Sequence, residues 1–267
     1  MLYWFFWLEA AIATLCLYLF GPSIHPAWIL PILIGFFLAL CILFVVYLEI
    51  TSFFFSKEKP KRPGRFAALT IRLALPWFSY LIGTRIRVTG KEKLPDTPTV
   101  FVCNHRSAFD PVFIITAFRR RKMAFVSKKS VLKYAFIGPY MNAAAFVFVD
   151  RESPMQSMRA IHRAAGYVKE SGIDYGVFPE GTRSRTGELL EFKQGAFLMA
   201  KKADAPIAVL TMEGSETAIS GLPFRLPRIT IHVVGVIPVE EVRTLTNEEI
   251  SARARAMMEA DLPHAKK

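Results

Sequence analysis

Two apolar runs at the N-terminus limit what this chain can fold into more than any other feature. Residues 2–20 contain one charged residue, Glu9, and residues 27–50 contain none before Glu49. The second run is long enough to cross the hydrocarbon core of a bilayer, and the first is of marginal length. The first run also lacks the basic start and the small-residue cleavage site of a signal peptide. We therefore expect residues 1–56 to form a membrane-embedded helical hairpin.

A basic segment follows the apolar runs. Residues 57–65 read KEKPKRPGR, and positive charge beside a membrane segment marks the cytoplasmic face and attracts anionic head groups. Residues 66–83 are apolar but are interrupted by Arg72 and Pro76, which favours an interfacial amphipathic helix over a third span. We expect residues 57–84 to form a basic linker and an interfacial helix. The protein should lie at the cell membrane, with the rest of the chain on its cytoplasmic face.

Residues 85–267 alternate between strand-like and helix-like segments. Short apolar or alternating runs predict strands at residues 85–90, 99–103, 123–127, 144–149, 173–178, 206–211 and 229–237. Helical patterns occupy residues 111–119, 154–170, 195–202 and 247–261, and a further helix should open at Lys128. The basic run at residues 119–122 is interpreted as a solvated helix end. Strands that alternate with helices are typical of an α/β fold.

Polar side chains follow the strand predicted at residues 99–103. Asn104 and His105 come directly after it, and Asp110-Pro111 has the pattern of a helix start, with Asp110 as the N-cap. Ligands usually bind at the carboxyl ends of strands in open α/β sheets. A tight loop can turn Asp110 back towards the His105 imidazole, which fixes the tautomer and leaves the other ring nitrogen free to accept a proton. Taken alone, the pair is explained better by an N-cap and an ordinary loop histidine.

A second stretch, VFPEGTRS at residues 177–184, has the same strand-to-loop pattern and makes the functional interpretation the stronger one. NHRSAFD at residues 104–110 resembles the HxxxxD motif of the glycerolipid acyltransferases, and FPEGTRS is similar to another of their motifs. FVDR at residues 148–151 and PIAVL at residues 206–210 resemble two further motifs in the same order. The chain thus resembles the bacterial-type 1-acylglycerol-3-phosphate acyltransferases over residues 85–240.

This resemblance implies a mixed sheet flanked by helices, with the acyltransferase catalytic domain at residues 85–267. The N-terminal hairpin would either span the bilayer or lie as a re-entrant pair in one leaflet. The implied reaction moves a fatty acyl group from acyl-CoA or acyl-carrier protein to the sn-2 hydroxyl of lysophosphatidic acid and gives phosphatidic acid. His105 would be the general base and Asp110 would orient it. The chain contains no GxSxG elbow, so we expect direct attack by the acceptor hydroxyl without an acyl-enzyme.

The candidates for substrate binding are Lys128, Arg151, Glu180, Gly181, Thr182 and Arg183. Gly181 permits close backbone approach, and its amide could form an anion-binding nest with the amide of Thr182. Arg183 can hold a phosphate through two parallel hydrogen bonds. Arg151 could do the same or form a structural ion pair with a neighbouring carboxylate. Lys128 is carried over from the resemblance, because family members have a lysine there that is proposed to hold the acceptor phosphate.

The net charge of +12 suits a nucleic acid, an anionic lipid surface or a phosphorylated substrate. No groove-reading motif is present, so we expect no nucleic-acid partner. The three cysteines and five histidines lack metal-ligand spacing, so we expect no metal and no cofactor besides the acyl donor. Two alternatives stay open. One is an acyltransferase for glycerol-3-phosphate, a lyso-aminolipid or another lysophospholipid, and the other is a catalytically inactive, membrane-tethered lipid-binding protein.

Overall fold

The computed structural model divides the chain into two compact units, Met1–Ser56 and Lys57–Lys267. It describes all residues except 1, 21–24, 57, 151, 219–225 and 263–267. The first unit contains helix α1 (Leu2–Phe20), a short 3-10 turn (Pro26–Trp28) and helix α2 (Ile29–Ser52). The two helices contact each other, and Trp7 of α1 stacks on Phe37 of α2 with ring centroids 4.8 Å apart.

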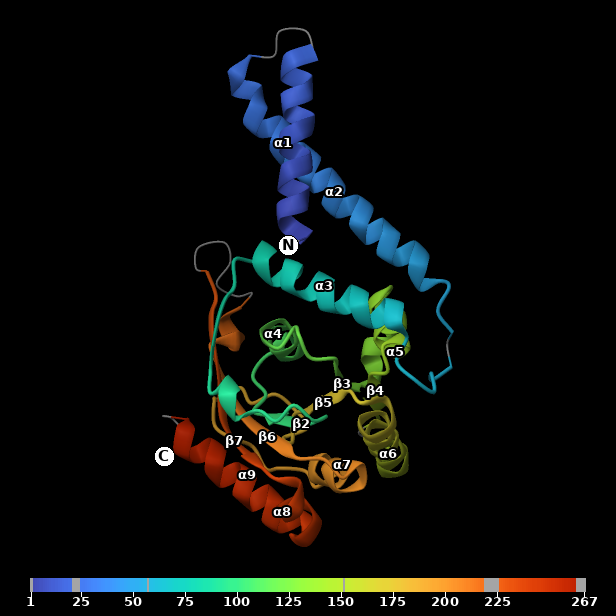
Figure 1. The fold of residues 1–267 in the computed structure, drawn as a ribbon, viewed down its shortest axis with the longest axis vertical. Helices are drawn as coiled ribbons and strands as arrows, with labels where there is room; N and C mark the ends of the chain where they lie inside the picture. The colour runs from blue at the N-terminus through green and yellow to red at the C-terminus, as the bar shows by residue number, and fades with distance from the viewer. Residues whose placement is uncertain (1, 21–24, 57, 151, 219–225, 263–267) are drawn as a thin grey trace. The chain divides into compact units, whose positions relative to one another are not determined.

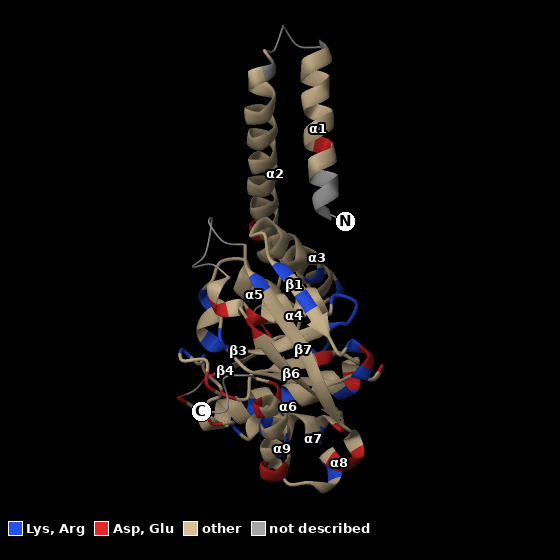
Figure 2. Cartoon of the chain, turned by 90° about the vertical axis from the view of Figure 1, so that its left-hand side faces the viewer, with Lys and Arg blue, Asp and Glu red and all other residues tan. Residues whose placement is uncertain are grey.

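The first unit carries almost no charge, as Figure 2 shows. Helix α2 is long and apolar enough to cross a membrane, whereas the apolar stretch of α1 at Trp7–Leu19 is shorter. Large apolar side chains of α2 stand exposed, among them Leu38 and Ile42. Exposed apolar side chains all along a helix are stable in hydrocarbon and costly in water. Helix α2 is therefore a candidate membrane span by its length and composition.

The second unit is built on a seven-stranded sheet with the spatial order β1–β7–β6–β2–β5–β3–β4. The strands are β1 (Arg85–Thr89), β2 (Val100–Cys103), β3 (Met123–Lys128), β4 (Val147–Val149), β5 (Asp174–Val177), β6 (Ile207–Glu213) and β7 (Arg228–Ile237). Strands β2 to β6 are parallel to one another, β7 is antiparallel to β6, and β1 is parallel to β7. The predicted α/β fold with a mixed sheet is confirmed.

Helices cover both faces of the sheet (Figure 1). On one side α3 (Arg65–Leu81) packs on α4 (Asp110–Ala117) and α5 (Ile137–Ala143). On the other side lie α6 (Pro154–Ser171), α7 (Gly195–Ala203), α8 (Val239–Thr244) and α9 (Asn247–Asp261). Because both faces are covered, the central strand β2 is buried along its whole length, which explains why its sequence is a continuous apolar run.

The segment between β3 and β4 differs from the prediction. A 3-10 turn over Lys129–Lys133 stands where a helix was expected to open, and helix α5 follows it. The strand expected at residues 144–149 is confined to Val147–Val149. Ala145 has a φ of 65°, and its amide donates to the carbonyl of Asn142 within the turn that ends α5. Residues 144–146 therefore terminate a helix before the chain enters the sheet.

The basic run at residues 119–122 is not a simple solvated helix end, because Arg121 is tied to the sheet. Its Nε lies 2.5 Å from Asp174 Oδ2, and its Nη1 donates to the carbonyl of Pro95 at 2.7 Å. The amide of Thr99 donates to Asp174 Oδ1 at 2.9 Å. The hydrogen bond to Asp174 raises the pKa of Arg121 above its usual value. This ion pair fastens together the segments that lead into β2, β3 and β5.

Candidate active site

Predicted site residues, and Asp150 beside the predicted Arg151, lie at the carboxyl ends of four neighbouring parallel strands. His105 follows β2, Glu180 follows β5, Lys128 ends β3 and Asp150 follows β4, in the spatial order β2–β5–β3–β4. Because these strands are parallel, the residues meet at one edge of the sheet, where ligands usually bind in such folds. Arg151 lies outside the described residues, directly after Asp150.

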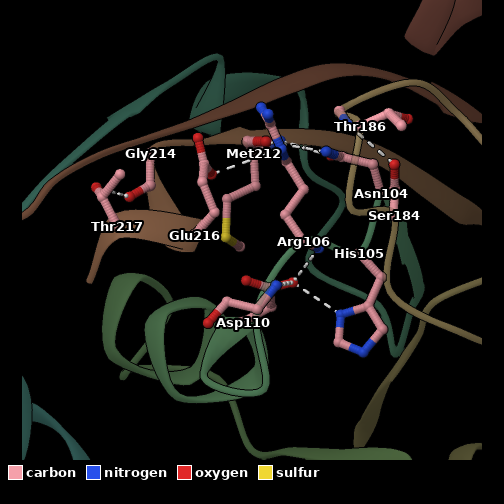
Figure 3. Close-up of polar contacts among 12 residues, drawn as sticks. Asn104, His105, Arg106, Asp110, Ser184, Thr186, Met212, Gly214, Glu216 and Thr217 are labelled. Carbon is pink, nitrogen blue, oxygen red and sulfur yellow. Dashed lines mark hydrogen bonds and ion pairs between the residues drawn. The ribbon is translucent and has the colours of Figure 1, made fainter. Parts of the chain in front are cut away.

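At the centre of this edge the structure brings His105 and Asp110 together (Figure 3). His105 Nδ1 lies 2.8 Å from Asp110 Oδ2. The backbone amides of Arg106 and Ser107 donate to the same oxygen at 2.8 and 2.9 Å. An ionised Asp110 only accepts hydrogen bonds, so the proton of a neutral His105 resides on Nδ1 and the lone pair on Nε2. This arrangement is suited to a general base.

The position of Asp110 corrects one detail of the prediction. Phe109 is the N-cap of α4, and Asp110 is the first helical residue, followed by Pro111. The Asp110 carboxylate accepts from the loop that precedes the helix instead of capping the helix itself. Asp110 is fully buried, and its second oxygen has no hydrogen-bond partner among the described residues. The carboxylate is therefore held entirely by the loop that it orients.

The imidazole of His105 is also held by aromatic packing. It stacks on Phe178 with centroids 4.1 Å apart and an interplanar angle of 14°. Phe178 stacks in turn on Phe125, with centroids 5.7 Å apart. The side chain of His105 remains 15% exposed, and within the described residues its Nε2 makes no hydrogen bond. The ring is thus fixed in orientation while its basic nitrogen stays open to a substrate.

Glu180 fixes the backbone of His105. Its Oε1 accepts from the His105 amide at 2.7 Å, and its Oε2 accepts from the Leu190 amide at 3.0 Å. The Ser184 amide donates to the His105 carbonyl at 2.8 Å. The loop at residues 180–184 therefore binds both the backbone N–H and the backbone C=O of His105. Glu180 is 2% exposed, and both its oxygens are engaged within the protein. This places Glu180 beneath the site, where it acts by positioning His105.

Replacing Glu180 with glutamine should lower both kcat and stability. Burial raises the pKa of Glu180, opposed by the two amide hydrogen bonds. Because this pKa is higher in the folded protein than its ordinary value of about 4.5, protonated Glu180 stabilises the folded state at low pH. This stabilisation is lost as the pH rises from about 4.5 through the raised pKa of the folded protein. Glutamine has one acceptor oxygen for two amides, so one amide loses its partner at a cost of about 1–3 kcal/mol. Chemical unfolding of both proteins between pH 4 and pH 7 should give a stability difference that depends on pH, and parallel pH curves would exclude this account.

The Gly181 amide is not free to form the predicted anion nest. It donates to the carbonyl of Phe178 at 3.0 Å. The prediction that the Gly181 and Thr182 amides together form an anion-binding nest is therefore wrong. Gly181 has a φ of 66°, and a Cβ there would lie 3.0 Å from the side chain of Lys193. Glycine is needed for this left-handed turn. The turn leaves Thr182 and Arg183 exposed.

Two of the predicted basic residues, Arg183 and Lys128, are exposed at this edge. Within the described part of the chain their side chains make no ion pair or hydrogen bond. The adjacent Lys129 is instead paired with Asp150 at 3.1 Å. This difference favours Lys128 over Lys129 as the lysine that meets an anion, and its role stays a prediction.

The sequence did not indicate how the neighbours of His105 fasten the loop. Asn104 is buried, its Oδ1 accepts from the Met212 amide at 2.7 Å, and its Nδ2 donates to the Met212 carbonyl at 2.9 Å (Figure 3). The Arg106 guanidinium lies 3.5 Å from the carboxylate of Glu216. The side-chain amide of Asn104 thus makes the two hydrogen bonds to β6 that the backbone of one more residue of β2 would make. The one indication in the sequence was that Asn104, a residue with a side-chain amide, directly follows a buried strand.

The chain is similar to several known acyltransferases. Residues 85–213 match the family model described as Acyltransferase. The chain is 30% identical to 1-acyl-sn-glycerol-3-phosphate acyltransferase alpha from Mus musculus, over 69% of this chain and 65% of that protein. It is 27% identical to the 1-acyl-sn-glycerol-3-phosphate acyltransferase of Saccharomyces cerevisiae, over 68% of this chain and 59% of that one. The chain therefore spans less than two thirds of the length of these relatives.

A bacterial relative and a solved structure extend the comparison. The chain is 29% identical to the 1-acyl-sn-glycerol-3-phosphate acyltransferase of Borreliella burgdorferi, over 72% of this chain and 77% of that one. The crystal structure of the 1-acyl-sn-glycerophosphate (LPA) acyltransferase PlsC from Thermotoga maritima has the same fold, with a TM-score of 0.61 and 20% identity. The match covers 84% of this chain and 90% of that one.

The mixed sheet with a histidine–carboxylate pair at its carboxyl edge defines the class of protein as an α/β domain with the fold of the Thermotoga maritima structure. The sequence matches narrow this description to one part of the chain. Residues 85–213 match the acyltransferase family, and the relatives named above are 1-acyl-sn-glycerol-3-phosphate acyltransferases.

Proposed function

We propose that the protein transfers a fatty acyl group from acyl-CoA or acyl-carrier protein to the sn-2 hydroxyl of lysophosphatidic acid. The observation that carries the proposal is the hydrogen bond between His105 and the buried Asp110, with the opposite ring nitrogen left open. The exposed Arg183 and Lys128 at the same edge suit an acceptor that carries a phosphate. The names of the yeast, mouse and Borreliella relatives support this acceptor.

In the proposed reaction His105 Nε2 takes the proton of the acceptor hydroxyl as its oxygen attacks the thioester carbonyl. The C–O bond forms, the C–S bond breaks, and the imidazolium returns the proton to the departing thiolate. Asp110 stabilises the imidazolium between these two steps. The products are the diacylated phospholipid and the free thiol.

The environment of Cys103 supports direct attack over an acyl-enzyme. Cys103 is buried in β2. Burial raises the pKa of the Cys103 thiol well above its usual value, and the charges of Asp110 and Glu180 raise it further. A protonated thiol without solvent access is a poor nucleophile. Its burial therefore argues against Cys103 as a nucleophile and supports direct attack by the acceptor hydroxyl.

Replacing Arg183 with lysine should raise the KM for lysophosphatidic acid about tenfold or more, with a smaller change in kcat. Lysine keeps the charge but loses the two parallel hydrogen bonds to a phosphate, and hydrogen bonds to charged groups contribute about 1.5–3 kcal/mol each. Initial rates over a range of acceptor concentrations measure this change. Arg185→Lys, at an exposed neighbouring position, is the matched control. An unchanged KM in Arg183→Lys would remove Arg183 from the acceptor site.

The membrane and cellular location are part of the same proposal. The exposed apolar length of α2 would anchor the protein in the cell membrane, and the basic residues at 57–65 would keep the second unit on the cytoplasmic face. A cysteine-accessibility assay in intact cells tests this placement. A cysteine introduced in the second unit should resist a membrane-impermeant reagent until the cells are opened.

Acyl transfer by the detergent-purified protein tests the reaction. Radiolabelled acyl-CoA and acyl-carrier protein would be supplied with lysophosphatidic acid, glycerol-3-phosphate and other lysolipids as acceptors. Label in phosphatidic acid with lysophosphatidic acid alone is the expected result and names the donor. Label in a different acceptor would replace the substrate and keep the mechanism. A folded protein that labels none of them would favour the lipid-binding alternative.

A further inference from the structure

A cavity lies at the edge of the sheet opposite His105. It has a volume of about 490 Å³ and is lined by the start of α3, the loop before β3 and the end of α6. Met123 is the first residue of β3, and Ile173 directly precedes β5. The cavity therefore lies at the amino ends of the parallel strands, whereas His105 lies at the carboxyl ends. It is a separate site from the one described above.

The wall of this cavity is strongly basic. It contains four cationic side chains that have no carboxylate within 4 Å among the described residues, those of Arg62, Arg65, Arg72 and Lys122. The carboxylate that lines the cavity is that of Glu170. Arg121 also lines it, but its charge is balanced by Asp174. Like charges that line one cavity repel one another, and a bound anion would reduce this repulsion.

The start of helix α3 also lines this cavity. Helix α3 begins at Arg65, and its first turn has neither an acidic residue nor a side-chain cap. The first N–H groups of a helix carry partial positive charge and bind anions. Guanidinium and ammonium donors together suit a ligand with several acceptor oxygens, such as a phosphate.

The surface beside the cavity is apolar. Leu69 lines the cavity and is 46% exposed, and Leu73, one turn further along α3, is also 46% exposed. Both belong to a helix that carries Arg65 and Arg72 on its cavity side. A cationic recess next to exposed leucines fits a molecule with an anionic head and an apolar tail better than it fits a free anion.

We propose that this cavity binds the phosphate head group of an anionic phospholipid, with Arg65 and Arg72 as its principal contacts. These two arginines are seven residues apart, so they lie two turns apart on one face of α3 and can bracket one phosphate. The site does not depend on the proposed reaction, because none of its residues lies at the carboxyl edge of the sheet. An inactive protein would bind the same lipid there.

Photolabelling of the full-length, detergent-purified protein tests this proposal. A short-chain phosphatidic acid with a diazirine in its acyl chain would be cross-linked, and the labelled peptides mapped by mass spectrometry. We expect label on peptides that contain residues 62–73 or 115–123. In an Arg65→Gln, Arg72→Gln double variant this label should fall at least tenfold. Arg87→Gln, at an exposed position on β1, should leave it unchanged.

Three outcomes would overturn the proposal. Equal labelling by the matching phosphatidylcholine probe would mean that the apolar surface alone binds. Protection by inorganic phosphate as strong as that by unlabelled phosphatidic acid would identify a soluble phosphate as the ligand. Label confined to peptides around residues 177–193, in wild type and double variant alike, would assign all lipid binding to the His105 edge. Label on the peptides around residues 177–193 in the double variant also shows that this variant is folded.

Discussion

His105→Ala should reduce acyl transfer by about 10³-fold or more while the protein stays folded. Positioned general bases typically contribute 10²–10⁴-fold to a rate, and no other imidazole stands beside Asp110 in the described structure. The variant also loses the stack on Phe178, so a modest fall in melting temperature is expected. Initial rates with saturating acceptor and donor, compared with circular dichroism of the same samples, measure both effects.

His232 provides the matched control for this experiment. Its Nδ1 lies 2.6 Å from Asp261 Oδ1, so it forms a second histidine–aspartate pair of the same kind. It lies on β7, whose strand direction is opposite to that of β2, far along the sheet order from β5 and β3. His232→Ala should keep turnover close to wild type. Retained turnover in a folded His105→Ala protein would disprove the base assignment.

Asp110→Asn should reduce kcat by about 10²- to 10³-fold with little change in the KM for the acceptor. The asparagine oxygen can replace Oδ2 and accept from His105, Arg106 and Ser107, while its NH₂ group replaces the oxygen that has no partner. The geometry is thus retained and the negative charge is lost. Without that charge the imidazolium formed during transfer is less stable. The effect therefore falls on the chemical step.

Asp110→Ala separates the negative charge of this carboxylate from its role as a hydrogen-bond acceptor for the loop. It removes the acceptor of two backbone amides and one imidazole nitrogen in a buried place, and each unsatisfied donor costs about 1–3 kcal/mol. The alanine variant should therefore unfold at a lower temperature than the asparagine variant, although both are slow. An asparagine variant with kcat within about threefold of wild type would mean that the charge of Asp110 contributes little.

Much of the fold followed from local patterns. The apolar run at residues 99–103 became the buried β2, and the helix and strand bounds from residue 154 onwards agree with the structure to within a few residues. Helices α5 and α8 were missed for physical reasons. Helix α5 contains Gly138, where a Cβ would overlap the carbonyl oxygen of Leu132, and glycine and proline normally indicate a turn. Helix α8 is too short for an apolar period to be recognised.

In the candidate site too, contacts between residues close in the sequence could be predicted and contacts between distant residues could not. The proximity of His105 and Asp110 was predictable because five residues of loop and a helix start fix it. The positioning function of Glu180 was not, because it depends on an amide 75 residues away in the chain. Asn104 joins Met212 across 108 residues. Composition and periodicity contain no information on such pairings, which are set by the strand order.

These long-range contacts have a consequence for biosynthesis. Asn104 and His105 leave the ribosome well before Glu180 and Met212, which complete their hydrogen bonds. A nascent chain that ends before Met212 therefore lacks a partner that holds the loop of His105 in place, even though His105 and Asp110 have already been made. The apolar α2 is synthesised earlier still. If the proposed function holds, the apolar α2 would thus be available for insertion into a membrane before the loop that carries His105 is complete.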